Sequence, residues 1–214
     1  VIDKNENVMN DASNGIVPFE EIDFKINLDQ ALESGLMFSS DISVVSKTDF
    51  VFITLGTSSN NEDIELFDSV INEVLVNAKE ETNIVLRSTV TIDSIFKIKK
   101  NDLFINKRIR LSYCPERIAE GLAFVELKNT PQIIGTDNDK DKKVFNELFQ
   151  TLEVKIINTS FENAVFTKLF SNAYRNAEFS LINFFNNIAE ENEINFEQIK
   201  EIATLEYPRL KNLP

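Results

Sequence analysis

The turn 114-CPERIAEG-121 combines a cysteine, a proline and carboxylates in a segment too irregular for one helix or strand. Pro115 restricts the backbone directly ahead of Glu116, which would hold that carboxylate in a fixed position. A carboxylate held beside a pocket can act through a water molecule as a general base; an ordinary surface-loop acid is the alternative. Because the chain contains no histidine, a Ser-His-Asp triad is excluded, and proton transfer would depend on carboxylates, lysine or water.

The overall composition limits the kind of partner. The 22 basic and 35 acidic residues give a net charge of −13, which repels the phosphate backbone of nucleic acid. The longest apolar runs, such as 50-FVFITL-55, are far shorter than the roughly 20 residues of a membrane helix. The single cysteine, Cys114, excludes a disulfide framework and a thiolate zinc site. We therefore expect a soluble, cytoplasmic protein that binds neither nucleic acid nor membrane and holds no metal.

Strand-length apolar runs alternate with segments of helical periodicity in the first part of the chain. The predicted strands are 50–55, 83–88, 109–113, 132–135 and 153–157. The segments 63–79 and 139–152 carry apolar residues at every third or fourth position, as one face of a helix does. This alternation predicts an α/β fold, a doubly wound and mostly parallel sheet with helices on both faces.

The pattern changes near residue 161. Residues 161–190 keep one helical phase for their whole length, and 195–204 form a shorter predicted helix. The longer helix carries phenylalanines on several faces, more than one small sheet can bury, which predicts a second partner surface. We therefore divide the chain into a sheet domain over residues 1–158 and a helical region over 159–214.

Polar residues follow the predicted strands, at the sheet edge where doubly wound folds bind their ligands. Asp3 ends the opening segment 1-VID-3, which has the form of a strand end. An acid there can accept hydrogen bonds from the ribose of a dinucleotide and repel a 2′-phosphate, although a helix cap or turn is the commoner role. The turns 55-LGTSS-59 and 88-STVT-91 add hydroxyl groups to the same predicted edge, with ordinary capping again the alternative.

Segments along the whole chain, taken in order, resemble the UDP-glucose/GDP-mannose dehydrogenases, which oxidise a nucleotide sugar at C6 to a uronate in a four-electron reaction. The matching segments are 1-VID-3, 14-NGIVPFE-20, 49-DFVFITLGTS-58, 88-STV-90, 114-CPERIAEG-121 and 168-KLFSNAYR-175. The resemblance implies a Rossmann-like NAD-binding domain over 1–158, without its first strand and glycine-rich loop. It also implies a long central helix and a truncated dimerisation region over 159–214.

The resemblance also assigns roles to residues of this chain. It implies that Lys168 and Asn172 stabilise the oxyanion formed during oxidation at C6, as preorganised donors do. These two residues are four apart and would share a helix face; a merely solvated face is the alternative. The implied catalytic residues are Glu116, Lys168, Asn172 and Thr89, the implied NAD-binding residues are Asp3, Thr57 and Thr89, and the implied substrate-binding residues are Glu116, Arg117, Glu120, Lys168, Asn172 and Arg175.

The chain departs from the family pattern at several positions. The family's nucleophilic cysteine lies beyond a turn like 207-YPR-209, so Cys114 is expected to be a small buried residue instead. Val165 and Phe184 stand where the family often has glutamate, and prolines beside two cofactor turns are lost. These changes fit either ordinary divergence or a relative that has lost its function.

Two functions are consistent with these observations. The first is the amino-terminal part of a homodimeric NAD-dependent dehydrogenase that oxidises a UDP-sugar for polysaccharide synthesis. The CPER segment favours a UDP-N-acetylhexosamine such as UDP-N-acetylmannosamine over UDP-glucose. The second is a binding or dimerisation module without activity. The chain opens without an initiator methionine and ends on a proline turn, so we expect a part of a longer protein that is inactive by itself.

Overall fold

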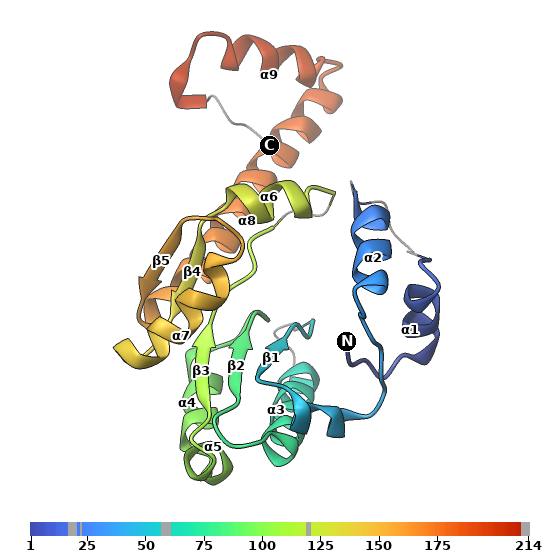
Figure 1. The fold of residues 1–214 in the computed structure, drawn as a ribbon. Coiled ribbons are helices and arrows are strands. Elements are labelled where there is room, and N and C mark those ends of the chain that lie inside the picture. The colour runs from blue at the N-terminus through green and yellow to red at the C-terminus, as the bar shows by residue number, and fades with distance from the viewer. Residues whose placement is uncertain (17–20, 22, 57–60, 119–120, 211–214) are drawn as a thin grey trace. The chain divides into compact units, whose positions relative to one another are not determined.

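The computed structural model describes residues 1–16, 21, 23–56, 61–118 and 121–210 (Figure 1). The chain forms two compact units, Val1–Val165 and Phe166–Pro214. The boundary expected from the sequence, between residues 158 and 159, lies just ahead of the long helix α8, whose first turn belongs to the first unit.

The first unit contains a five-stranded sheet with its strands in chain order. The strands are β1 (Phe50–Ile53), β2 (Asn83–Leu86), β3 (Arg110–Tyr113), β4 (Gln132–Gly135) and β5 (Ile156–Thr159). β1, β2 and β3 are parallel, as are β4 and β5, while β3 and β4 run antiparallel. The predicted mostly parallel sheet is confirmed. The opening residues differ from the prediction, because within the described part of the chain Ile2 forms an isolated bridge with Ser39 rather than a strand.

Helices connect the strands and form the second unit. They are α1 (Glu6–Ser13), α2 (Phe24–Glu33), η1 (Ile42–Lys47), α3 (Asn61–Asn77), α4 (Ile92–Lys100), α5 (Asp102–Asn106), α6 (Ala123–Asn129), α7 (Asp139–Gln150), α8 (Phe161–Glu191), α9 (Phe196–Thr204) and η2 (Pro208–Leu210). The four predicted helices correspond to α3, α7, α8 and α9. Short helices begin at local caps: Thr91 accepts a hydrogen bond from the Ser94 amide at the start of α4. None of the described helices has the length and apolar character needed to cross a membrane.

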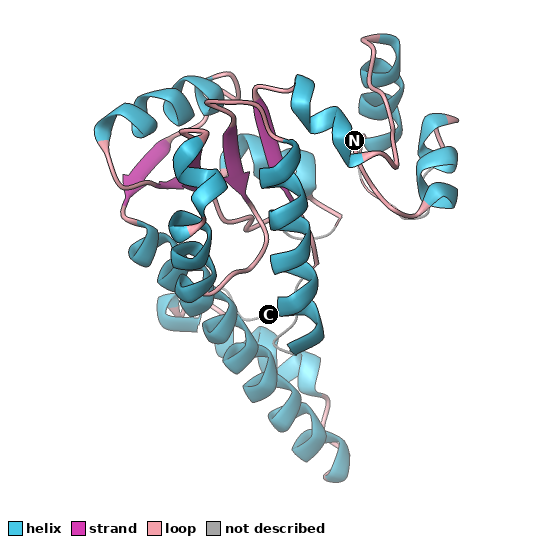
Figure 2. Cartoon of the chain, turned by 90° about the horizontal axis from the view of Figure 1, so that it is seen from below, coloured by secondary structure: helices cyan, strands magenta, loops and turns pink. Residues whose placement is uncertain are grey.

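Side chains alternate between the two faces of the sheet and enter two hydrophobic clusters. In β2, Ile84 and Leu86 belong to the larger cluster and Val85 to the smaller one. The larger cluster is completed by α3, α4 and the first turn of α8, and the smaller by Phe145 and Phe149 of α7. Helices therefore cover both faces of the sheet (Figure 2), which explains why β2 and β4 are buried along their whole length.

The two parallel groups of strands join at one point. Within the described residues, β3 and β4 pair only through Tyr113 and Gly135. A β carbon at Gly135 would lie 2.8 Å from the β carbon of Ala164 and 3.1 Å from the carbonyl oxygen of Ser160. The lack of a side chain at Gly135 therefore lets the start of α8 pack directly on this junction.

A lysine remote in the sequence caps the end of α3. The last turn of α3 contains no basic residue, and the Lys107 ammonium instead lies 2.7–2.8 Å from the carbonyl oxygens of Leu75, Val76 and Ala78. Each of the three ammonium hydrogens therefore has an acceptor. The cation also lies at the helix end whose dipole favours positive charge.

We expect Lys107→Met to lower the free energy of unfolding by ~1.5–3 kcal/mol, the range typical of hydrogen bonds to a charged group. Urea denaturation followed by circular dichroism measures this change. The matched control is Lys97→Met, which breaks an ion pair to Asp68 in which the lysine side chain is 63% exposed. The control should lower the free energy of unfolding by less than ~1 kcal/mol. Equal effects of the two substitutions would contradict the capping role of Lys107.

Candidate active site

Three strand ends meet at one edge of the sheet. Because β1, β2 and β3 are parallel, the segments that follow them lie at the edge where doubly wound folds bind ligands. Arg87 follows β2, and Glu116 lies in the turn after β3. β4 runs antiparallel to β3, so its first residue, Gln132, lies near the same edge, within hydrogen-bonding distance of Arg87. Polar side chains from the segments after β2 and β3 and from the start of β4 therefore converge here.

Arg87 and Glu116 form an ion pair across the ends of β2 and β3. The Nη2 atom of Arg87 donates to Oε2 of Glu116, and Nη1 donates to Oε1 of Gln132 at 3.3 Å. The guanidinium carbon lies 5.8 Å from the ring centroid of Phe149. Burial lowers the pKa of Arg87, but an arginine remains protonated at physiological pH. The Arg87 side chain is 11% exposed, whereas the Glu116 side chain is 37% exposed. The ion pair therefore joins a buried cation to a carboxylate that solvent can reach.

The turn that carries Glu116 also fixes its carboxylate. The Oε1 atom accepts hydrogen bonds from the backbone N–H groups of Arg117 at 2.8 Å and Ile118 at 3.0 Å. Pro115 is buried directly ahead of it and restrains the backbone. The structure thus places Glu116 at the carboxyl end of β3 with both oxygens engaged by donors.

The remainder of this turn is attached to other segments of the first unit. Arg117 donates from Nη2 to the carbonyl oxygen of Pro131 at 2.7 Å, which secures the turn to the residue before β4. Glu21 accepts hydrogen bonds from the backbone N–H groups of Gly121 at 2.7 Å and Ala123 at 2.6 Å, at the start of α6. These contacts connect the described residues at both ends of the turn to other segments.

The residues predicted to bind the cofactor lie in the first unit. Asp3 is exposed and accepts a hydrogen bond from the backbone N–H of Asn5 at 2.8 Å. This contact fits the turn role that the sequence offers as the alternative, while the side chain stays exposed. Thr89 is half-buried beyond the end of β2. Thr57 and the predicted substrate residue Glu120 lie outside the described residues. In the part of the chain that is described, no cluster of three or more His, Cys, Asp or Glu side chains could hold a metal ion.

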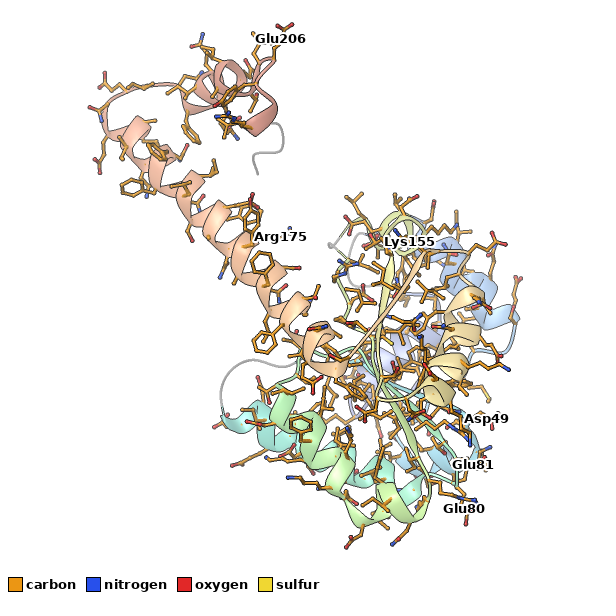
Figure 3. The ribbon with its side chains drawn as sticks, turned by 90° about the vertical axis from the view of Figure 1, so that its left-hand side faces the viewer. Asp49, Glu80, Glu81, Lys155, Arg175 and Glu206 are labelled. Atoms are coloured by element: carbon orange, nitrogen blue, oxygen red, sulfur yellow. The ribbon has the colours of Figure 1, made fainter. Side chains whose placement is uncertain are left out.

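The remaining predicted site residues lie on α8, in the second unit. Lys168 is half-buried and Asn172 is exposed; their spacing of four residues puts them on one helix face. Arg175, labelled in Figure 3, is also exposed, and its guanidinium carbon lies 5.9 Å from the ring centroid of Phe179. The helix therefore presents three adjacent hydrogen-bond donors within two turns.

Cys114 lies next to this site in the sequence but is not accessible. Its side chain is buried, and its Sγ atom lies 3.0 Å from Oγ of Ser112. Burial raises the pKa of the Cys114 thiol to about 12, outweighing the opposing effects of Ser112 and the Arg87 cation. The thiol is therefore neutral at physiological pH. The expectation that Cys114 is a small buried residue is confirmed. Because the thiolate is the nucleophilic form of cysteine, the neutral Cys114 thiol is a poor nucleophile.

The sequence did not predict three residues as part of this site: Arg87, Gln132 and Glu21. Arg87 directly precedes 88-STV-90, and Glu21 directly follows 14-NGIVPFE-20, so proximity to a recognised segment was the available signal for both. Gln132 offers no such signal, since its contact with Arg87 spans 45 residues of sequence.

Residues 1–153 match a family model described as the NAD binding domain of the UDP-glucose/GDP-mannose dehydrogenase family. The chain is 28% identical to a UDP-N-acetyl-D-mannosamine dehydrogenase of Methanococcus maripaludis over 223 residues, which covers 99% of this chain and 50% of the relative. It is 27% identical to the UDP-glucose 6-dehydrogenase YwqF of Bacillus subtilis over 175 residues, covering 78% of this chain and 38% of the relative. The chain thus spans about half the length of the UDP-N-acetyl-D-mannosamine dehydrogenases of Methanococcus maripaludis that it matches.

Solved structures share the fold. The UDP-D-ManNAc dehydrogenase of Pyrococcus horikoshii superimposes with a TM-score of 0.85 at 20% sequence identity, over 97% of this chain and 52% of that one. The arrangement of sheet and helices is therefore that of a Rossmann-like dehydrogenase.

Proposed function

Because this chain belongs to the UDP-glucose/GDP-mannose dehydrogenase family, we propose that the whole protein uses NAD to oxidise C6 of a UDP-sugar to a carboxylate. The family's NAD-binding domain covers residues 1–153. The observation that carries the proposal is the position of Glu116 at the carboxyl end of β3, inside this domain. Arg87 and two backbone N–H groups hold its carboxylate in one orientation, and a fixed position is the first requirement of a general base.

The residues present fit NAD as the cofactor. Asp3 offers an exposed carboxylate just beyond the bridge at Ile2, where it can accept hydrogen bonds from ribose hydroxyls and repel a 2′-phosphate. NAD, when bound, supplies the hydride acceptor. Conversion of a primary alcohol to a carboxylate removes two hydrides, so the overall reaction consumes two NAD and one water and releases two NADH and three protons.

The proposed roles of the remaining residues are those that the family resemblance implies. Glu116 takes a proton from the water that attacks the oxidised C6 carbon. Lys168 and Asn172 donate hydrogen bonds to the negative charge that develops on the C6 oxygen. Cys114 takes no part, because its buried thiol is neutral.

The UDP-sugar is proposed to be a UDP-N-acetylhexosamine, with UDP-N-acetylmannosamine as the first candidate. The 28% identity to a UDP-N-acetyl-D-mannosamine dehydrogenase extends over 99% of this chain, and the CPER segment supports the same choice. UDP-glucose is the second candidate, because the Bacillus subtilis relative is a UDP-glucose 6-dehydrogenase.

The purified whole protein is expected to form about two NADH for each uronate. The assay measures NADH by absorbance and uronate by mass spectrometry, with UDP-N-acetylmannosamine, UDP-N-acetylglucosamine and UDP-glucose compared side by side. A ratio near one, with an aldehyde as the product, would contradict the four-electron reaction. Equal rates with NADP would separately rule out Asp3 as the residue that binds the ribose.

We also propose that two copies of the chain associate through α8. Five phenylalanines on this helix are each at least 45% exposed, and exposed apolar surface of this extent marks an interaction site. They are Phe166, Phe170, Phe179, Phe184 and Phe185. Such association would also suit the second candidate function, a dimerisation module without activity.

The mass from light scattering is expected to reach a plateau at twice 24.5 kDa across a concentration series of the chain. Phe170→Ser should shift the mass towards the monomer, since Phe170 is 70% exposed on the proposed contact helix. Phe96→Ser, on α4 and 38% exposed, is the control and should leave the mass unchanged. A monomer at every concentration, or a mass that rises without limit, would contradict a two-fold dimer.

A further inference from the structure

Arg87 contacts three separate parts of the first unit. It follows β2, pairs with Glu116 beyond β3, donates to Gln132 at the start of β4, and lies against the ring of Phe149 on α7. With its side chain 11% exposed, the guanidinium has lost most of its contact with water. A buried cation is retained at low cost only when its donors are satisfied in good geometry, and these contacts supply that compensation.

The chemistry of the side chain explains why an arginine occupies this position. The planar guanidinium presents several N–H donors in a fixed fork. Two of its nitrogens reach different acceptors, Nη2 the carboxylate of Glu116 and Nη1 the amide oxygen of Gln132. A lysine has one nitrogen at the end of a flexible stem, and it could not maintain both contacts in the same geometry.

We propose that Arg87 is a positioning residue for the oxidation reaction, acting through Glu116. Its fork fixes Oε2 of the glutamate, while the N–H groups of Arg117 and Ile118 fix Oε1. The carboxylate thereby keeps one orientation at the carboxyl end of β3, and a misplacement of about 1 Å in such a group can reduce turnover about 100-fold. This inference rests on the proposed function, in which Glu116 is the general base.

The test compares Arg87→Met and Arg87→Lys in the whole protein, with Arg110→Met as the matched control. Arg110 is similarly buried, with its side chain 16% exposed, and pairs with Glu81 (labelled in Figure 3) and Asp141. It also donates to the amide oxygen of Asn83 at 3.3 Å. Since Arg110 opens β3, it lies at the opposite end of the strand from Glu116.

We expect Arg87→Met to lower kcat by about 10- to 100-fold with little change in the KM for NAD, and Arg87→Lys to recover part of that loss. Arg110→Met should lower the thermal midpoint of unfolding by about as much as Arg87→Met does. It should leave kcat within about twofold of wild type. In a Glu116→Gln background, Arg87→Met should cause no further loss, because residues that act as one unit are not additive. A wild-type kcat in folded Arg87→Met, or an equal loss in both backgrounds, would overturn the proposal.

A second measurement does not depend on activity. Urea unfolding of the 214-residue chain gives the unfolding constant of Arg87→Met, of Glu116→Gln and of the double variant. Each variant changes this constant by some factor. The factor for the double variant should differ by about tenfold or more from the product of the two single-variant factors. Simple additivity would show that Arg87 does not hold Glu116, and would overturn the inference. If the wild-type whole protein oxidises no UDP-sugar, the proposed function fails, whereas the unfolding cycle still decides whether the two side chains are coupled.

Discussion

Glu116→Gln in the whole protein is expected to slow uronate formation by ~100- to 10,000-fold, the contribution typical of a general base. Glutamine keeps the size of the side chain and can still accept the N–H bonds of Arg117 and Ile118 through its amide oxygen. It cannot take a proton from water at neutral pH. The loss should therefore appear in kcat, with the KM for NAD nearly unchanged.

The control for this substitution is Glu80→Gln. Glu80 is an exposed carboxylate that pairs with the exposed Arg108, with side-chain exposures of 69% and 67%. Its replacement should leave kcat within about twofold of wild type and the fold intact. Steady-state kinetics together with circular dichroism of each variant separates loss of chemistry from loss of structure. A folded Glu116→Gln enzyme with kcat within about tenfold of wild type would remove Glu116 from the role of general base.

Lys168→Ala is expected to lower kcat by ~100- to 1,000-fold, as removal of one oxyanion donor does in other enzymes. The ammonium is proposed to face charge that is absent from the ground-state alcohol, so the substitution should affect kcat more than the KM for the UDP-sugar. Asn172→Ala, on the same face of α8, should cause a loss of the same kind. The double variant should lose less than the product of the two single losses, because both donors would serve one oxygen.

The control for the α8 donors is Lys200→Ala. Lys200 lies on α9, in the same unit, where it pairs with Glu197 at 3.0 Å and lies against the ring of Phe196. It should change kcat by less than about twofold. An increase in KM without a change in kcat in Lys168→Ala would show that Lys168 binds the ground state and the transition state equally. Lys168 would then have no selective effect on the transition state.

The fold was predictable where the physical signal is local and repeated. β2 and β4 are short apolar runs buried on both faces, and α3, α7 and α8 repeat their apolar positions over several turns. The helices α5 and α6 were missed because they have only five and seven residues, too few for periodicity to show. The strand expected at residues 1–3 is only a bridge, because Ile2 pairs with Ser39 alone among the described residues.

The site was predictable only in part, for a different reason. A proline before a glutamate at the end of an apolar run is visible in one chain, so the position of Glu116 could be expected. Its partner could not, because Arg87 lies 29 residues away and reaches Glu116 only when β2 and β3 lie side by side. The Lys107 cap on α3 and the contacts of Glu21 with the start of α6 depend in the same way on tertiary structure.

Among the described residues, β3 and β4 pair only through Tyr113 and Gly135, which has a consequence for the cooperativity of the fold. Backbone hydrogen bonds hold β1, β2 and β3 together as one block, and β4 with β5 as another, but at the seam the two blocks depend mainly on side chains from both hydrophobic clusters. Arg87 crosses this seam, because it directly follows β2 of the first block and donates to Gln132, the first residue of β4 in the second. Local opening of the seam would therefore release the Arg87 guanidinium before either block unfolds. In native-state hydrogen exchange, the backbone amides of β4 and β5 should exchange together, as a unit separate from those of β1–β3.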